Sequence, residues 1–366
     1  MKLSAETLTA PSHPVARLPA EWEEQVLAWG EPAYRGKQIF DWIHRKGVLD
    51  PNEMSNLPKT LRQRLSEEGL GWPIHVVSSH ESADQTKKLL VGMADGERVE
   101  TVLIPQLDDE RIFTQCISSQ VGCAMGCVFC ASGVAGLKRQ MTDAEIVAQV
   151  LLGRREIGPD RRIRNVVFMG MGEPLHNYDA VARALVLLTH PDGLDLSKRR
   201  VTVSTSGLVK QIDRLGREFG GQVQLAISLH AVSDEARSEI MPVNRKHGLG
   251  ELTAALRRYP LSKRQRITIE YTLIEGVNDS PSDANGMVEL LRGIPVKVNL
   301  IPMNPISASE LRAPDSDHVK RFQEQLTRHG LSVFVRKTRG DDVAAACGQL
   351  AFHGESRRTG VSAKPG

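Results

Sequence analysis

The chain of 366 residues has few aromatic residues (4%), only five cysteines and a net charge of just +3. No run of apolar residues approaches the length of a membrane span, and residues 1–20 contain no apolar core of signal-peptide length. These absences predict a cytoplasmic protein without a membrane partner. Because thiols stay reduced in the cytosol and five is an odd number, a framework of structural disulfides is not expected.

The small net charge does not by itself indicate nucleic-acid binding, but the basic residues are gathered into clumps. The clumps lie at 154–155, 161–164, 198–200, 257–258, 263–266 and 336–339. A single clump is typical of a solvated helix end or turn. Six clumps allow a face that follows phosphates, and Arg336 and Arg339 are candidates for that contact.

The composition divides the chain into unequal parts. Residues 1–20 are expected to form a flexible leader, and residues 353–366 a disordered tail. Between 21 and 73 apolar residues recur at helical spacing, which predicts a small helical domain that holds all four tryptophans. Core packing is the plain explanation of these tryptophans, and base stacking is the alternative. Residues 74–104 contain short β-like runs and are predicted to link this domain to the main one.

Residues 105–352 alternate between strand and helix patterns about six times. Seven runs are strand-like: IFTQCIS, NVVFMG, RVTVST, VQLAISLH, ITIEYTLI, VKVNLIP and SVFVRK. Helical stretches separate most of them, which predicts a parallel sheet of the α/β class with right-handed crossovers. An open doubly wound sheet and a partial (β/α)6 barrel both fit. Polar residues follow the strands in GMGEP, STSG, SLH and IPMNP, which favours the barrel, because barrels build their sites at the carboxyl ends of strands.

Four of the five cysteines lie in one segment, CISSQVGCAMGCVFC at 116–130. Cys123, Cys127 and Cys130 have the spacing C-x3-C-x2-C, which can bind three irons of a 4Fe–4S cube and leave the fourth iron open. Zinc is the alternative metal. It prefers four protein ligands in a structural site, and Cys116 is the nearest further thiol. A third interpretation, simple burial of thiols, gives no cause for their clustering in a cysteine-poor chain.

The cysteine motif, with Phe129 before its last cysteine, resembles that of radical S-adenosylmethionine (SAM) enzymes. The next strand end, GMGEP at 170–174, resembles the superfamily's motif for the methionine amino group, with Glu173 as its acceptor. Over residues 20–352 the chain is similar to one family, the adenine-C2 RNA methyltransferases. The segments that carry this resemblance are SSQVGC, MGMGEPLHNYD, KRRVTVSTSG, LAISLHA, MPVN, TIEYTLIEGVND, KVNLIPMNP and TRGDDVAAACGQL.

The resemblance implies a fold and an activity. It makes 105–352 a radical SAM core, a partial (β/α)6 barrel, and 21–73 a small helical accessory domain that binds RNA. The family methylates an adenosine of 23S rRNA and, in some members, an adenosine of tRNA. An electron donor such as flavodoxin or ferredoxin is a further implied partner, and a monomer is expected.

The resemblance also implies roles for the remaining thiols. Carbon 2 of adenine is electron-poor, so the family uses a radical route and first stores the methyl group on the enzyme. Cys347 in ACGQL corresponds to the methyl carrier, and Cys116 to the thiol that attacks the carrier sulfur and releases the RNA through a transient disulfide. Glu100 corresponds to the proton acceptor. Taken alone, Cys347 would be assigned as a buried helix cysteine and Glu100 as an exposed strand-edge residue.

The implied cofactors are a 4Fe–4S cluster and SAM, with two SAM molecules used per turnover. The cofactor contacts implied by the resemblance lie at successive strand ends: Gly172, Glu173, Ser204, Ser228, Leu229, His230 and Asn304. His230 has the alternative of a buried structural histidine.

Two other functions compete with this interpretation. A related activity methylates carbon 8 of adenine and confers antibiotic resistance, and it shares the motif set, although KTRGDD here resembles the C2 type. The other is a zinc-bearing RNA-binding protein without catalysis. Nucleoside analysis separates the first two, and metal content identifies the third.

Overall fold

The computed structural model describes residues 8–307, 309–336 and 339–350. The beginning of the predicted leader, the predicted tail at 353–366, and Lys337 and Thr338 of one basic clump lie outside the described residues. None of the helices formed by the described residues combines the length and the apolarity that a bilayer crossing requires.

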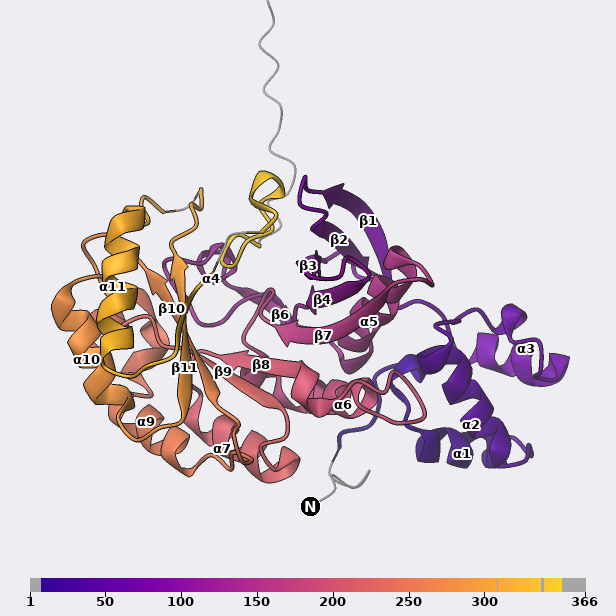
Figure 1. Ribbon diagram of the computed structural model, residues 1–366. Coiled ribbons are helices and arrows are strands. Elements are labelled where there is room, and N and C mark those ends of the chain that lie inside the picture. The colour runs from indigo at the N-terminus through magenta and orange to yellow at the C-terminus, as the bar shows by residue number, and fades with distance from the viewer. Residues whose placement is uncertain (1–7, 308, 337–338, 351–366) are drawn as a thin grey trace, which may run out of the picture.

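A small helical unit begins the described chain (indigo in Figure 1). Its helices are α1 (Pro19–Ala28), α2 (Tyr34–Phe40), which continues into a π-helical turn at Asp41–Arg45, and α3 (Lys59–Glu67). Trp22, Val26, Ile39, Phe40 and Ile43 are fully buried between them. Trp29, Trp42 and Trp72 are only half-buried, so core packing explains Trp22 fully and the other three in part.

One ten-stranded sheet forms the centre of the molecule, in the order β1-β2-β3-β4-β7-β8-β9-β10-β11-β12. Its strands are β1 (Ile74–Glu81), β2 (Lys87–Met93), β3 (Arg98–Pro105), β4 (Ile112–Cys116), β7 (Arg162–Phe168), β8 (Val201–Thr205), β9 (Gln224–Ser228), β10 (Ile267–Leu273), β11 (Val296–Pro302) and β12 (Val333–Val335). Strands β1 to β4 pair antiparallel, and the pairs from β4 to β12 are parallel. The run predicted to link the domains therefore extends the main sheet.

Helices cover the parallel strands on the outside and connect one strand to the next (Figure 1). They are α5 (Asp143–Ile157), α6 (Tyr178–Leu188), α7 (Val209–Phe219), α8 (Asp234–Ile240), α9 (Leu249–Arg258), α10 (Pro281–Leu291) and α11 (Ser316–Arg328). Short 3-10 turns lie at Pro14–Ala16, Pro51–Glu53, Pro174–Asn177, Lys198–Arg200, Pro242–Arg245 and Asp341–Val343. Every residue of β10 is buried, because helices cover one face and the site lies against the other. The predicted α/β class and partial barrel are confirmed, with β12 as a short seventh parallel strand.

The cysteine loop is closed at its base by a small hairpin that the sequence analysis did not predict. Strand β5 (Gln120–Gly122) pairs antiparallel with β6 (Leu137–Gln140), and the short helix α4 (Ala131–Ala135) lies between them. Gly122 has φ +76°, and a Cβ there would lie 1.8 Å from the carbonyl oxygen of Gly136. Only glycine fits that approach, which brings both ends of the loop together.

Candidate active site

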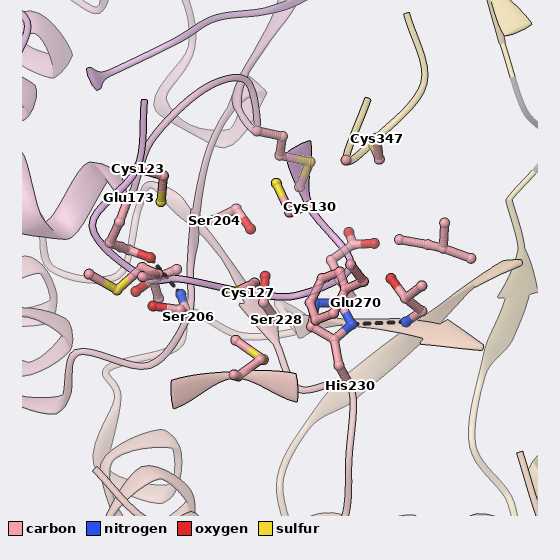
Figure 2. Close-up of a pocket in the computed structure, with 18 of the residues that line it drawn as sticks. Cys123, Cys127, Cys130, Glu173, Ser204, Ser206, Ser228, His230, Glu270 and Cys347 are labelled. Atoms are coloured by element: carbon pink, nitrogen blue, oxygen red, sulfur yellow. Dashed lines mark hydrogen bonds between the residues drawn. The ribbon is translucent and has the colours of Figure 1, made fainter. Parts of the chain in front are cut away.

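The carboxyl ends of the parallel strands and the cysteine loop enclose one cavity of about 890 Å³, part of it open to solvent. Ten of the predicted site residues line it (Figure 2): Cys123, Cys127, Cys130, Gly172, Glu173, Ser204, Ser228, His230, Asn304 and Cys347. The cavity lies where a barrel builds its site.

The three thiols of the loop are closely confined. Cys123 and Cys127 are each 9% exposed. Burial raises the pKa of Cys123 to about 12. Burial and the two neighbouring thiols also raise the pKa of Cys127 well above its usual value. Such a site disfavours three bare thiolates, and a bound cation that neutralises them removes that cost.

The arrangement of these thiols bears on the choice of metal. Among the residues that the structure describes, no three His, Cys, Asp or Glu side chains are arranged to hold a single metal ion. A zinc ion would draw the sulfurs to about 3.8 Å from one another, because Zn–S bonds are about 2.3 Å long in a tetrahedron. A 4Fe–4S cube spreads three thiolates over three irons and needs no such convergence. Three thiolates with one position left open are the donor set of such a cube, whereas a structural zinc site needs a fourth protein ligand and Cys116 does not line the cavity.

Glu173 is held rigidly beside the loop. It is 4% exposed, and its carboxylate accepts hydrogen bonds from the backbone N–H groups of Leu175 (3.0 Å) and Ser206 (2.7 Å). Burial raises its pKa, and these hydrogen bonds oppose the rise. Gly172 before it has φ +102°, and a Cβ there would lie 2.5 Å from the side chain of Gln120. The carboxylate oxygens keep lone pairs for an ammonium group of a ligand.

His230 lines the cavity as a neutral ring. Its Nδ1 accepts a hydrogen bond from the backbone N–H of Thr272 (2.9 Å), which leaves the proton on Nε2. Burial and the nearby Arg237 lower its pKa to about 3. Phe129 of the cysteine loop packs edge-on against it at 4.6 Å. The preceding Leu229 is buried and does not line the cavity, so the structure does not bring it together with the other predicted cofactor contacts.

Cys347 reaches the cavity on a segment that several hydrogen bonds fix to the cysteine loop and to β11. Asn304 donates from its side-chain amide to the carbonyl oxygen of Cys347 (2.9 Å). The backbone N–H of Ala131 donates to the carbonyl oxygen of Gly348 (2.8 Å). Gln349 donates from its side chain to the carbonyl oxygen of Pro305 (3.1 Å). These contacts bring residue 347 to the same cavity as the thiols at 123, 127 and 130.

Cys116 and Glu100 do not line the cavity, but they lie close to it on one face of the sheet. Cys116 pairs with Val102 in the antiparallel register of β3 and β4, and Glu100 is two residues from Val102 on the same strand. Paired residues and those two apart share a sheet face. Glu100 is 7% exposed, so it is not the exposed strand-edge residue of the plain interpretation, and Lys88 pairs with it at 3.0 Å. All five cysteines are free thiols.

The sequence did not predict that two charged residues, Glu270 and Arg336, line the cavity together. Glu270 on β10 is 5% exposed; Asn299 donates to its Oε1 (3.0 Å), and its Oε2 has no hydrogen-bond partner among the described residues. Arg336 also lines the cavity, and the charges of Cys347, Glu270 and Cys116 raise its pKa. Arg336 thus lines the site, and its contact with phosphate stays a prediction. Glu270 could have been found from the sequence, because a carboxylate within the apolar run ITIEYTLI indicates a buried charged residue.

Arg237 was also missed, although it joins the ends of two neighbouring strands, β8 and β9. It is fully buried and donates to the carbonyl oxygens of Leu229 (2.9 Å), Ser206 (2.7 Å) and Ser228 (3.0 Å). A fourth bond goes to Oδ1 of Asn244 (2.8 Å). In sequence it sits in DEARSEI among charged residues, where nothing distinguishes it from a surface arginine.

Three basic clumps lie at the opposite end of the sheet from the cavity. The clumps at 161–164, 198–200 and 263–266 directly precede or begin β7, β8 and β10, at the amino ends of these strands. Arg339, which is expected to contact phosphate, already forms an ion pair with Asp84 at 3.2 Å. A phosphate would have to compete with that carboxylate.

Comparisons with known proteins agree with this geometry. The family model of the radical SAM superfamily matches residues 117–284, and that of the ribosomal RNA large subunit methyltransferase N-terminal domain matches residues 20–69. The dual-specificity RNA methyltransferase RlmN of Sorangium cellulosum is 57% identical, with 94% of this chain and 97% of that protein covered. RlmN of Syntrophobacter fumaroxidans is 47% identical, with 90% and 95% covered.

A solved structure extends the likeness to three dimensions. The crystal structure of a radical SAM methyltransferase from Sphaerobacter thermophilus matches with a TM-score of 0.88 and 45% identity, covering 93% of this chain and 99% of that one. Both family models, the near-complete coverage of the relatives and the shared fold lead to one assignment. The chain belongs to the RlmN family of radical SAM RNA methyltransferases.

Proposed function

We propose that this enzyme methylates carbon 2 of a specific adenosine in 23S rRNA and of an adenosine in tRNA. The near-complete match to RNA methyltransferases described as dual-specificity supports two RNA substrates. The match of residues 20–69 to a ribosomal RNA methyltransferase N-terminal domain supports RNA contact by the helical unit. Half-buried tryptophans there offer ring surface to a base.

One observation carries the proposal: the sulfur-bearing residue 347 lines the same cavity as the three loop cysteines, more than 200 residues earlier in the chain. A methyl carrier must meet both the cofactor and the RNA base. Cys347 is half-buried, so it contacts the cavity and keeps some exposure. A purely structural cysteine would not need either property.

Cys123, Cys127 and Cys130 would hold a 4Fe–4S cluster, and Glu173, Ser204, Ser228, His230 and Asn304 would hold SAM beside it. Bound there, the two cofactors supply a methyl group and, by one-electron cleavage, a carbon radical. Glu173 offers a carboxylate to the methionine ammonium group. The neutral Nε2–H of His230 offers a donor that does not repel the cationic sulfonium.

The chain's own residues would then carry the methyl group. Each turnover would use two SAM molecules, one supplying the methyl group that Cys347 accepts and the other the radical chemistry that removes one hydrogen atom from that S-methyl group. The methylene carbon on Cys347 would add to adenine C2 as a covalent protein–RNA adduct, which would give up one electron to the cluster while Glu100 takes the C2 proton. The Cys116 thiolate would then attack the sulfur of Cys347, which forms a transient disulfide and breaks the sulfur–carbon bond, and the released carbon would take up a proton to become the methyl group.

Arg336 supports the last step, since it lines the cavity with Cys347 and Glu270 and its charge acts on the thiols of Cys347 and Cys116. Burial raises the pKa of Cys116 to about 12, and the guanidinium works against this rise. A nearby fixed cation is the usual means of stabilising a buried thiolate. We further propose a cytoplasmic monomer that receives its electrons from a carrier such as flavodoxin or ferredoxin.

The decisive experiment incubates anaerobically reconstituted enzyme with SAM and a reductant on 23S rRNA fragments and, separately, on tRNA. Mass spectrometry of the nucleosides should find 2-methyladenosine from both RNAs. A product methylated at carbon 8 would replace the C2 assignment by the resistance-type activity. Protein that carries zinc without iron and sulfide, and yields no product, would instead indicate a binding protein.

The carrier role has its own test in Cys347→Ala. This variant should form neither methylated RNA nor a covalent RNA adduct, because no sulfur holds the methyl group. Wild-type amounts of methylated RNA from Cys347→Ala would refute the carrier assignment.

A further inference from the structure

A second hollow of about 1,490 Å³, open to solvent, lies against the outer side of the cysteine loop. Ala124 and Met125 of the loop form one wall, and residues of α6, α7 and the turn at Pro242–Arg245 and beyond form the others. We call this hollow the loop groove. Met125 lines both the loop groove and the active-site cavity, so one side chain separates the two spaces.

The loop groove is positively charged. Lys210 and Lys246 line it, both are exposed, and neither lies within ion-pair distance of a carboxylate among the described residues. Arg214 between them is neutralised by Asp179 (2.8 Å) and Glu218 (2.7 Å). Two more exposed cations are close in sequence to these residues, Arg217 on α7 and Arg245 before Lys246.

The cysteine loop presents an apolar outer face next to these cations. Ala124, Gly126 and Val128 are exposed, whereas Cys123 before Ala124 and Cys127 before Val128 are buried. The loop is also firmly seated at this place, because the backbone N–H of Val128 donates to the carbonyl oxygen of Ile240 (3.1 Å). A small apolar surface beside two lysines without a carboxylate partner is the form of a docking site for an acidic protein.

The position of Cys347 separates this face from the RNA path. In the view of Figure 2, Cys123 and Glu173 lie at one end of the cavity and Cys347 at the other. The loop groove adjoins the first end, through Ala124, Met125, Leu175 and His176. RNA must reach the sulfur of Cys347, whereas the loop groove adjoins the other end of the cavity, next to the loop cysteines.

We propose that the loop groove and the outer face of the cysteine loop dock an acidic electron-carrier protein of the flavodoxin type. This inference rests on the proposed function, because only a cluster held by the loop needs an electron there. The carrier gives up one electron, the cluster takes it up, and no atom is exchanged. The two prosthetic groups would then be separated mainly by Met125 and the loop backbone.

The test is the charge-reversed double variant Lys210→Glu/Lys246→Glu. Its matched control, Lys320→Glu/Arg328→Glu, changes the net charge equally at exposed cations of α11, none of which lines the loop groove. Two quantities are measured on anaerobic holoenzyme: the affinity for a purified flavodoxin by calorimetry, and the rate of cluster reduction by flavodoxin hydroquinone in stopped flow. Reduction by dithionite, a small molecule that needs no docking, is followed in parallel.

The double variant should lose about tenfold or more in flavodoxin affinity and reduction rate at low salt, since like charges then face each other. Added salt should narrow this gap. Dithionite reduction, iron content and RNA affinity should stay within about twofold of wild type, and the control variant should match wild type.

Three results would overturn the docking site. The first is a double variant that keeps the wild-type flavodoxin affinity and reduction rate. The second is a double variant in which cluster reduction by dithionite slows as much as reduction by flavodoxin. The third is a loss of RNA affinity while flavodoxin binding stays intact, which would make RNA the occupant of the loop groove. Failure of the proposed function would look different. Flavodoxin would then bind and reduce the cluster as expected, but no methylated RNA would form.

Discussion

Asn304, at the end of β11, donates a hydrogen bond from its side-chain amide to the carbonyl oxygen of Cys347 (2.9 Å). One residue thus joins a predicted cofactor contact to the predicted methyl carrier. The next contact along the segment, from Gln349 to the carbonyl oxygen of Pro305 (3.1 Å), has no part in the cavity wall. The two residues therefore allow positioning of the carrier to be separated from cofactor binding.

Asn304→Ala should weaken SAM binding and also slow methylation of the residue 347 sulfur, because it removes a cavity contact and an anchor of the segment. Gln349→Ala should slow that methylation while leaving SAM affinity within about twofold, because it removes two hydrogen bonds that hold the segment, each worth about 1 kcal/mol, and no cavity contact. Equilibrium binding of SAM and mass spectrometry of the Cys347 peptide give the two readouts. Equal losses of SAM affinity in both variants would contradict this division.

Arg237→Gln should be among the most destabilising single changes in the core. Burial lowers the pKa of Arg237 to about 10, yet its guanidinium still satisfies three carbonyl oxygens at the strand ends. Leaving these carbonyls unpaired should cost about 3–5 kcal/mol in the free energy of unfolding. Urea titration measures this loss. The control is Arg257→Gln, at an exposed position of α9, which should change the free energy of unfolding little.

The parallel core could be predicted because each of its strands is a short apolar run ended by polar residues. The run ITIEYTLI became β10, which is buried throughout, and SVFVRK became the short β12. The hairpin of β5 and β6 could not be found in this way. Its strands have three and four residues, QVG and LKRQ, and their pairing depends on where the chain returns after the cysteine loop.

The site could be predicted as far as its members follow strand ends or the cysteine spacing. Glu173, Ser204, Ser228 and Asn304 do so, and topology alone brings strand ends together. Arg336 was noticed only as part of a basic clump. Its placement toward Cys347 and Glu270 depends on the side-by-side pairing of β11 and β12, which no local pattern encodes.

Glu100→Gln should accumulate the covalent RNA adduct, because the amide cannot take the proton from adenine C2. Glu100 is buried next to Lys88, with its Oε2 without a hydrogen-bond partner among the described residues, so an acceptor oxygen is free. Denaturing gels should show a protein–RNA species that is absent from the double variant Glu100→Gln/Cys347→Ala. Glu81→Gln, at an exposed position on β1, should turn over like wild type.

The helical unit should lose stability in mild acid through His44. This ring is fully buried; its Nε2 donates to the carbonyl oxygen of Val15 (3.0 Å), and its Nδ1 has no hydrogen-bond partner among the described residues. Burial is the main cause that lowers its pKa to about 3, and the nearby His190 and Arg154 lower it further. In the unfolded chain a histidine titrates near 6.5.

Between about pH 6.5 and 3 the unfolded chain therefore binds a proton at residue 44 that the folded chain does not. The free energy of unfolding falls as the pH falls, by up to about 1.4 kcal/mol per pH unit from this group.

His44→Leu should reduce that slope, even though it removes the bond to Val15 and lowers stability at pH 7. His80→Leu, on the exposed part of β1, should keep the wild-type slope. Tryptophan fluorescence during urea unfolding reports on this unit directly, because all four tryptophans lie between residues 22 and 72; an unchanged slope in His44→Leu would show that other groups control the acid response.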